Sequence, residues 1–266
     1  MNEIATYLLL GIIEGLTEFL PVSSTGHLIL AGALLGFEGE SSVAFKIAIQ
    51  FGAIMAVLVA YWRRFWSVAE GMVRRDPASW AFTRNILLGF LPALAIGVVA
   101  YDAIRAAIQT PILVAVMLVL GGIVILLIER TVKRVRFESV EGVPTRTALA
   151  IGFVQCLAMV PGVSRSGATI MGALMMGVER KTAAEFSFFL AVPTMAAAAS
   201  YALWKDRALL SADDIGAIAI GLVTSFVVAL AVVKAFVAIV SRYGFAPFAW
   251  YRIVVGSLAL VWLLAR

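Results

Sequence analysis

Apolar stretches suited to crossing a lipid bilayer recur along the whole chain. A transmembrane helix needs about 20 consecutive, mostly apolar residues. Six stretches approach or reach this length with no more than one formal charge each, and we expect each to form a full transmembrane helix. They are residues 43–62, 85–101, 106–128, 186–204, 215–233 and 245–265. The pattern predicts an all-α polytopic membrane protein.

Two further apolar regions, 4–37 and 147–178, differ because a polar, helix-breaking centre interrupts each of them. The apolar arms on either side are roughly 10–17 residues long, which is short for a full span. Irregular backbone at membrane depth is tolerated only inside protein or beside water. We therefore expect two re-entrant helical hairpins whose polar tips lie within the membrane domain and face one another.

The two hairpin regions are related by an internal repeat. A constant offset of 141 residues aligns them, and a shifted offset aligns later segments. Repeats of about 1–135 and 142–266 would each hold one hairpin and three spans, so the second repeat is inverted relative to the first within a single membrane domain. The matched pairs include Gly11 with Gly152, Ser23 with Ser164, Gly26 with Gly167, Gly36 with Gly177 and, at the shifted offset, Gly89 with Gly221.

The composition excludes a soluble globular protein. Of the 266 residues, 62% are hydrophobic and 14% are charged, and the mean hydropathy is +1.01. Soluble domains carry about 25% charged residues. The single cysteine, Cys156, cannot form an internal disulfide. A net charge of +5 could suggest a nucleic acid partner, but most basic residues lie between the spans, so we expect no nucleic acid.

The distribution of Lys and Arg predicts an orientation, because cytoplasmic loops of membrane proteins are enriched in these residues. If the 63–84 loop is cytoplasmic, thirteen basic residues lie inside, four lie outside, and both termini are outside. Lys46 and Arg252 lie within spans, and their side chains are expected to extend toward the membrane surface. The inner set is Arg63, Arg64, Arg74, Arg75, Arg84, Arg130, Lys133, Arg134, Arg136, Arg146, Arg180, Lys181 and Arg242; the outer set is Arg105, Lys205, Arg207 and Arg266.

Two carboxylates lie in the first polar centre. Glu14 and Glu18 are four residues apart and share one helix face. Carboxylates in lipid repel each other and require a cation, a proton or an arginine. Such oxygen ligands suit Mg²⁺ or Ca²⁺, and Mg²⁺ typically binds one or two carboxylates together with substrate phosphates. The pair is a candidate catalytic metal site, and the alternative is a protonated, hydrogen-bonded pair with a structural role.

Three hydroxyl groups and the only histidine of the chain follow these carboxylates. Pro21 and Gly26 break the helix, and the backbone N–H groups that open the next arm can bind an anion. His27 lies beside the carboxylates and hydroxyls, which favours a role as general acid, general base or nucleophile. The hydroxyls are those of Ser23, Ser24 and Thr25.

An arginine between two serines lies in the second polar centre. The guanidinium of Arg165 presents a fork of donors that fits phosphate oxygens, and the hydroxyls of Ser164 and Ser166 add further donors. A structural ion pair between Arg165 and Glu14 or Glu18 is the alternative, and the two interpretations are compatible in the empty protein. Together the tips supply carboxylates, imidazole, hydroxyls and a guanidinium, which suits phosphoryl transfer.

Residues 14–27 and 161–169 resemble the two signature sequences of the undecaprenyl pyrophosphate phosphatases of the bacitracin-resistance type. The resemblance covers essentially the whole chain. It implies a protein of the bacterial inner membrane that requires a divalent cation and hydrolyses undecaprenyl diphosphate to the monophosphate carrier of cell-wall synthesis. The site would open to the periplasmic or outer face, and the lipid tail would lie in an apolar groove between spans.

The resemblance also implies roles for the residues of the tips. Glu14 and Glu18 would hold the cation or manage protons, and Arg165 would hold the diphosphate. Covalent attack by Ser24, covalent attack by His27 and direct attack by water all fit the sequence. The hydroxyl groups implied to assist Arg165 are those of Ser164, Ser166 and Thr169, and Ser23 and Thr25 are further candidate substrate-binding residues.

Two other classes of function fit parts of this pattern. Inverted repeats with broken helices are typical of transporters, so a transporter or flippase for a phosphorylated lipid is the main alternative. A passive scaffold with purely structural tips is the second. Phosphate release from the purified protein distinguishes an enzyme from both. The sequence is also compatible with a homodimer.

Overall fold

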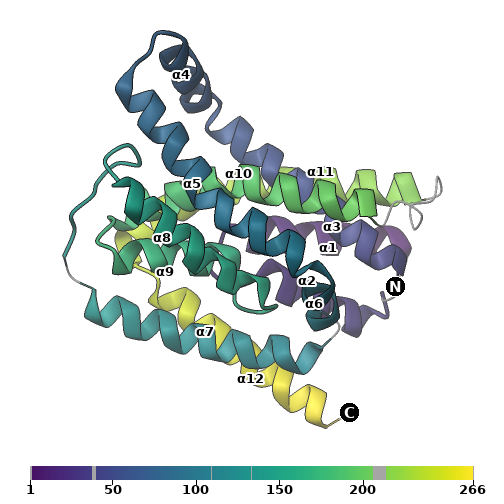
Figure 1. Ribbon diagram of the computed structural model, residues 1–266. Helices are drawn as coiled ribbons and strands as arrows, with labels where there is room; N and C mark the ends of the chain where they lie inside the picture. Colours follow the sequence, from purple (N-terminus) through teal and green to yellow (C-terminus); the bar gives the residue numbers. More distant parts are fainter. Residues whose placement is uncertain (1, 38–39, 109, 133, 206–213, 266) are drawn as a thin grey trace.

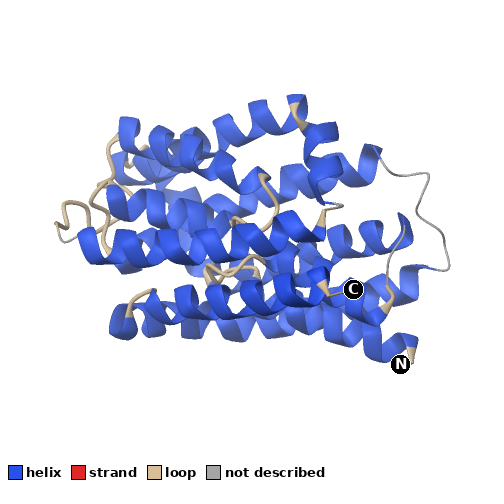
Figure 2. Ribbon diagram, turned by 90° about the horizontal axis from the view of Figure 1, so that it is seen from below, coloured by secondary structure: helices blue, strands red, loops and turns tan. Residues whose placement is uncertain are grey.

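The computed structural model describes residues 2–37, 40–108, 110–132, 134–205 and 214–265, which form a bundle of helices (Figures 1 and 2). The longer helices run side by side, and the two chain ends lie toward the same end of the bundle (Figure 1). In order, the described helices are α1 (Glu3–Thr17), α2 (Ser24–Leu35), α3 (Glu40–Ala60), α4 (Trp62–Val73), α5 (Pro77–Val99), α6 (Tyr101–Ile108), α7 (Pro111–Thr131), α8 (Thr145–Gln155), the 3₁₀ helix η1 (Cys156–Met159), α9 (Arg165–Met175), α10 (Arg180–Lys205), α11 (Asp214–Tyr243) and α12 (Ala246–Leu264).

Five of the described helices are long and apolar enough to cross a membrane, namely α5, α7, α10, α11 and α12. The consecutive helices α3 and α4 pass the same test only as a pair, and they bend by 69° at the break between them. Over the described residues, the prediction of an all-α multi-pass membrane protein is therefore confirmed, with five to six candidate spans.

Two predicted segments differ from the structure. The stretch 106–128 was expected to be one helix, but α6 ends at Ile108 and α7 begins at Pro111. Proline is favoured at the start of a helix and breaks its interior, which explains the separate start of α7. The expected loop 63–84 is instead a helical hairpin of α4 and the first turns of α5, which projects from the bundle (Figure 1).

The turn of this α4–α5 hairpin is made by Asp76, the N-cap of α5. Its Oδ2 accepts hydrogen bonds from the backbone N–H of Ser79 at 2.9 Å and from the Ser79 hydroxyl at 2.7 Å. These bonds stabilise the charged carboxylate, so they hold the pKa of the Asp76 carboxyl below its usual value. Pro77 follows at the start of the helix, where its fixed φ is already helical.

The two hairpins that carry the polar tips turn in the same way. Helices α1 and α2 form the first hairpin, and α8, η1 and α9 form the second. Ser23 and Ser164 have φ of 70° and 80° and are the N-caps of α2 and α9. Their hydroxyls accept from the N–H groups of Gly26 at 3.3 Å and Gly167 at 3.1 Å. Positive φ is uncommon for residues other than glycine, so its occurrence at both tips indicates a shared turn geometry.

Each hairpin packs its first arm against a helix from the other half of the chain. Helix α1 lies on α11, and α8 lies on α5. A Cβ atom on Gly11 would lie 2.7 Å from the Gly221 carbonyl oxygen, and one on Gly152 would lie 2.5 Å from the Gly89 carbonyl oxygen. Glycine at these crossings lets the backbones approach closely, as is common in membrane proteins. The arms that lead to both tips are thereby anchored inside the bundle.

Candidate active site

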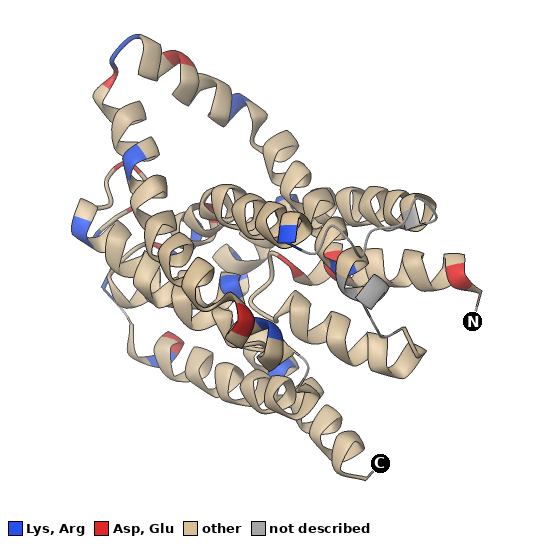
Figure 3. Cartoon of the chain, turned by 45° about the vertical axis from the view of Figure 1, so that its right-hand side comes forward, with Lys and Arg blue, Asp and Glu red and all other residues tan. Residues whose placement is uncertain are grey.

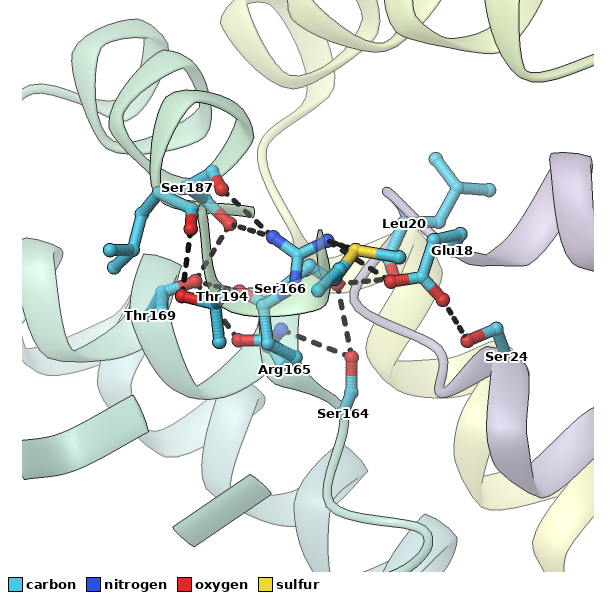
Figure 4. A network of polar contacts seen from close by, with 12 residues as sticks. Glu18, Leu20, Ser24, Ser164, Arg165, Ser166, Thr169, Ser187 and Thr194 are labelled. Carbon is cyan, nitrogen blue, oxygen red and sulfur yellow. Dashed lines mark hydrogen bonds and ion pairs between the residues drawn. The ribbon is translucent and has the colours of Figure 1, made fainter. Parts of the chain in front are cut away.

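The two polar tips meet in the interior of the protein. Arg165, the first residue of α9, forms an ion pair of 3.2 Å between its Nη2 and Oε1 of Glu18, which follows α1 (Figure 4). Ser166 donates its hydroxyl to the carbonyl oxygen of Leu20 at 2.7 Å, which forms a second link between the tips. The expectation that the tips lie together is therefore confirmed.

The Arg165 guanidinium is held on one side and has an unused donor on the other. Its Nη1 donates to the carbonyl oxygen of Ser187 at 2.8 Å and to the Ser187 hydroxyl at 3.1 Å. The Thr169 and Ser187 hydroxyls are in turn 2.7 Å apart. The Nε of Arg165 is buried without a hydrogen-bond partner among the described residues. Because a buried unpaired donor is costly, this Nε is suited to a phosphate oxygen.

Glu18 also contacts Ser24. The Ser24 hydroxyl donates to Oε2 of Glu18, while Oε1 of the same carboxylate accepts from Arg165 (Figure 4). Ser24 opens α2, so its hydroxyl lies at the positive end of that helix. A carboxylate bonded to a hydroxyl in this way can accept the proton when the oxygen attacks an electrophile.

Glu14 lies one helical turn before Glu18, near the end of α1. Its side chain has 0% exposure, and neither carboxylate oxygen has a hydrogen-bond partner among the described residues. It lies within electrostatic range of both Glu18 and Arg165. Two unpaired oxygens beside a second carboxylate suit a proton or a cation. No group of three or more His, Cys, Asp or Glu side chains suited to a metal occurs in the described chain, so a metal here would need further ligands from phosphate and water.

His27 is bonded to the Ser23 backbone and to Tyr251. Its Nδ1 lies 2.8 Å from the Ser23 carbonyl oxygen, and its Nε2 lies 2.9 Å from the Tyr251 hydroxyl on α12. Both ring nitrogens are thus bonded to groups other than Glu18 and Arg165, and a catalytic role of His27 stays a prediction. Tyr251 itself gave no signal in the sequence, because one tyrosine in an apolar span is ordinary.

A cavity of about 440 Å³ opens beside the meeting point of the tips. Apolar side chains from α5 and α10 form much of its wall, which suits a lipid carrying a polar headgroup. Glu14, His27, Ser166 and Thr169 lie outside this wall, and direct substrate contact by them stays a prediction. The predicted site residues that do line the cavity are Glu18, Ser23, Ser24, Thr25, Ser164 and Arg165.

The expectation for Arg252 is wrong, because its side chain does not reach the membrane surface. Arg252 is 0% exposed and makes five hydrogen bonds of 2.7–3.2 Å to backbone carbonyl oxygens. The breaks at the two tips leave carbonyl groups without intrahelical partners, and a buried guanidinium can satisfy several of these at once while also bonding to carbonyl groups of a neighbouring helix. The five acceptors are Met117 and Leu118 on α7, Pro21 in the first tip, and Gly162 and Val163 in the second.

The fold and the site define a multi-pass membrane protein with an arginine, a carboxylate and a serine hydroxyl joined beside one cavity inside the helical bundle. The chain belongs to the family of the bacitracin resistance protein BacA, whose family model matches residues 7–258. The family resemblance carried by residues 14–27 and 161–169 is therefore confirmed.

Curated relatives match over nearly the full length. The chain is 71% identical over 263 residues to an undecaprenyl-diphosphatase of Sphingopyxis alaskensis, and the match covers 99% of each chain. It is 60% identical over 264 residues to an undecaprenyl-diphosphatase of Rhizorhabdus wittichii, again over 99% of each chain. An undecaprenyl-diphosphatase 2 of Paramagnetospirillum magneticum is 53% identical over 259 residues, which cover 97% of this chain and 98% of the relative.

Proposed function

We propose that this protein is a membrane phosphatase that hydrolyses undecaprenyl diphosphate to undecaprenyl phosphate and inorganic phosphate. The observation that carries this proposal is the buried contact from Arg165 through Glu18 to Ser24 beside an apolar cavity. The membership of the BacA family and the names of the relatives agree with it. The product is the lipid carrier that cell-wall synthesis reuses, and its recycling opposes bacitracin.

The terminal phosphate would bind at Arg165. The unpaired Nε and the Nη2 that now contacts Glu18 can both donate to phosphate oxygens, so the substrate would replace the carboxylate on the guanidinium. The Nη1 bonds to Ser187 would persist and hold the fork in place. The undecaprenyl chain would lie along the apolar wall of the cavity and leave the diphosphate at the tips.

Ser24 is the nucleophile that this geometry favours. Its Oγ would form a bond to the terminal phosphorus while the anhydride P–O bond breaks, and Glu18 would take the hydroxyl proton. Undecaprenyl phosphate would leave with the electron pair of the broken bond. The oxygen of a water would then bond to the phosphorus of the phosphoserine as the Ser24 O–P bond breaks. Glu18 would give its proton to the departing Ser24 oxygen, and the proton lost by the water would stay with the released phosphate. Direct attack by a water beside Glu18 is the alternative, whereas both nitrogens of His27 are engaged elsewhere.

A divalent cation, Mg²⁺ or Ca²⁺, would be held by Glu14 and Glu18. The support for this is the pair of unpartnered, fully buried oxygens on Glu14 beside a second carboxylate. When bound, the cation would neutralise charge on the diphosphate. Removal of divalent cations with a chelator should abolish phosphate release, and Mg²⁺ or Ca²⁺ should restore it. Full activity after exhaustive chelation would contradict the requirement.

The support for an inverted repeat comes from the glycine crossings. Gly11 in the first repeat corresponds to Gly152 in the second, and Gly89 corresponds to Gly221. Gly11 packs on Gly221, and Gly152 packs on Gly89, so the two contacts are equivalent under exchange of the repeats. The two hairpins would enter the membrane from opposite sides as re-entrant elements and meet at its midplane.

The distribution of basic residues supports an orientation in the membrane. Basic residues mark the α4–α5 hairpin and the neighbouring end of the bundle, away from the two termini (Figure 3). The positive-inside rule then favours a cytoplasmic hairpin with both termini outside, in the inner membrane, and a cavity open to the outer face. Of the basic residues used for the prediction, Lys133, Arg207 and Arg266 lie outside the described residues.

Phosphate release by the purified protein in detergent tests the proposed function. The wild-type protein should convert undecaprenyl diphosphate to the monophosphate and phosphate, although a detergent solution has no compartments and no gradient. A transporter or flippase would move the lipid in vesicles without this release. Absence of hydrolysis by a folded protein, with divalent cations present, would overturn the proposal.

A further inference from the structure

The hydrogen bonds of His27 define its tautomer. The Ser23 carbonyl oxygen, 2.8 Å from Nδ1, can only accept, so Nδ1 carries the hydrogen. In a neutral imidazole Nε2 is then an acceptor, and the Tyr251 hydroxyl at 2.9 Å must donate to it. Both ring nitrogens are therefore engaged, and the imidazole bridges the first tip and α12.

Tyr251 also fixes the plane of this imidazole. The two rings are nearly parallel, with an interplanar angle of 7° and centroids 5.5 Å apart. Because the Tyr251 hydroxyl lies 2.9 Å from Nε2, the rings lie side by side, and the hydrogen bond holds the imidazole in this plane. The next residue on α12, Arg252, donates to the Pro21 carbonyl at 3.0 Å. Two consecutive residues of α12 thus support both ends of the break before α2.

The support extends to Ser24. The Ser23 carbonyl accepts from the backbone N–H of His27 at 3.1 Å as well as from Nδ1. Ser23 has φ of 70°, an uncommon conformation for a residue with a side chain, so it needs such contacts to persist. Ser24 follows directly and donates its hydroxyl to Glu18. A shift of the Ser23 carbonyl would therefore move the Ser24 hydroxyl away from the carboxylate.

We propose that Tyr251 is a positioning residue for the hydrolysis, which fixes the tautomer and plane of His27 and thereby the strained Ser23 turn that aims Ser24 at the substrate. The inference rests on the proposed phosphatase function. In this arrangement His27 stabilises the first tip and does not itself attack phosphorus.

The single histidine allows a direct test by NMR of protein with ¹⁵N-labelled histidine, purified through an affinity tag without histidine. The wild type should show one histidine with Nδ1 protonated and Nε2 unprotonated. Tyr251→Phe keeps the aromatic ring and removes the donor to Nε2, so the Nε2 signal should shift and the second tautomer should become populated. A wild-type Nε2 that carries a hydrogen, or signals that are the same in Tyr251→Phe, would overturn the proposal.

Kinetics supply the second readout. Loss of one hydrogen bond that acts through the turn should lower kcat of Tyr251→Phe by about fivefold, with KM changed less than about twofold. The matched control is Tyr243→Phe at the exposed end of α11, which should leave both constants unchanged. A change in KM alone, or no change in kcat, would contradict a positioning role. If the wild type released no phosphate, the proposed function would fail while the NMR result still reported on the Tyr251 contact.

Discussion

Arg165 and Glu18 form a buried ion pair of 3.2 Å, although 147 positions separate them along the chain. Their side chains are 12% and 6% exposed. A buried ion pair is weak evidence for stability, because the desolvation cost offsets most of the attraction. Its position beside the cavity suggests another role. Glu18 occupies a guanidinium nitrogen that the substrate phosphate would take, so the pair keeps Arg165 in place until the phosphate binds.

Arg165→Lys should reduce kcat/KM by about a hundredfold, because an ammonium cannot reproduce the guanidinium fork. The lysine retains the charge that balances Glu18, so the protein should still fold, as judged by an unchanged elution volume in detergent. Arg242→Lys, at the exposed end of α11, is the matched control and should retain activity. If the kcat/KM of Arg165→Lys stayed within about threefold of the wild-type value, phosphate binding by the guanidinium fork would be contradicted.

Ser24→Ala should lower phosphate release by on the order of a thousandfold or more, because the loss of a nucleophile removes a whole step of the reaction. Acid quenching of the wild type during turnover with substrate labelled in the terminal phosphate should trap label on the protein, and Ser24→Ala should trap none. Ser23→Ala removes the hydroxyl that caps Gly26 and should lower stability by about 1 kcal/mol, but it keeps the Ser24 oxygen and should still trap label. Near-normal turnover by Ser24→Ala would leave direct attack by water as the mechanism.

The sequence predicted the two hairpins well because their signals are local. Proline, glycine and hydroxyl residues in the middle of an apolar region mark a broken helix, and the repeat pairs one tip with the other. The contact between Glu18 and Arg165 could also be predicted from the sequence, because an unpaired charge inside a membrane is costly and opposite charges there form pairs. The sequence does not show which hydroxyls contact a substrate. The hydroxyls of Ser166 and Thr169 contact Leu20 and Ser187, and neither residue lines the cavity.

The buried position of Arg252 and the helical conformation of α4 could not be inferred from the sequence, for two different reasons. The partners of Arg252 are carbonyl groups, which every residue carries, so no side-chain pattern reveals which of them a broken helix leaves unpaired. Helix α4 mixes exposed tryptophans with arginines, and a search for apolar runs assigns such a segment to a loop. Apolar and polar residues alternate along α4 with the period of a helix, which indicates an amphipathic helix. A search for stretches without charge does not detect this pattern.

Arg252→Met should destabilise the protein strongly. Methionine keeps much of the side-chain volume, but the carbonyl groups of Pro21, Gly162 and Val163, which lie between helices, lose their donor. Each unpaired buried carbonyl costs about 1 kcal/mol or more. Thermal unfolding in detergent should show that the free energy of unfolding falls by at least about 3 kcal/mol. Arg242→Met removes an exposed arginine and is the control for the loss of charge. Equal unfolding temperatures for the two variants would show that the hydrogen bonds from Arg252 to the tips contribute little to stability.

Asp76→Ala should destabilise the α4–α5 hairpin in a pH-dependent manner. The Asp76 pKa is lowered in the folded protein, so its contribution is full above the unfolded pKa of about 3.9 and is lost as pH falls through the folded pKa. The unfolding temperatures of wild type and variant should therefore differ at pH 7 and converge at the acidic end. A difference that stays constant down to about pH 3 would assign the effect to the backbone rather than to the carboxylate.

Gly152→Ala tests whether the hairpins depend on their crossings with the opposite repeat. The added Cβ would lie 2.5 Å from the Gly89 carbonyl oxygen and 2.9 Å from the Gly89 Cα, and neither backbone atom can move without shifting α5. Overpacking of this kind costs about 1–3 kcal/mol, and any shift of α8 is passed to the tip that carries Arg165. Both unfolding temperature and phosphate release should therefore fall. Gly216→Ala on α11, where a Cβ meets nothing within 4 Å, should change neither. If Gly152→Ala lost stability but kept full turnover, the tip would be held by Arg252 and the Ser166–Leu20 contact alone, and the crossing would serve the fold without serving the site.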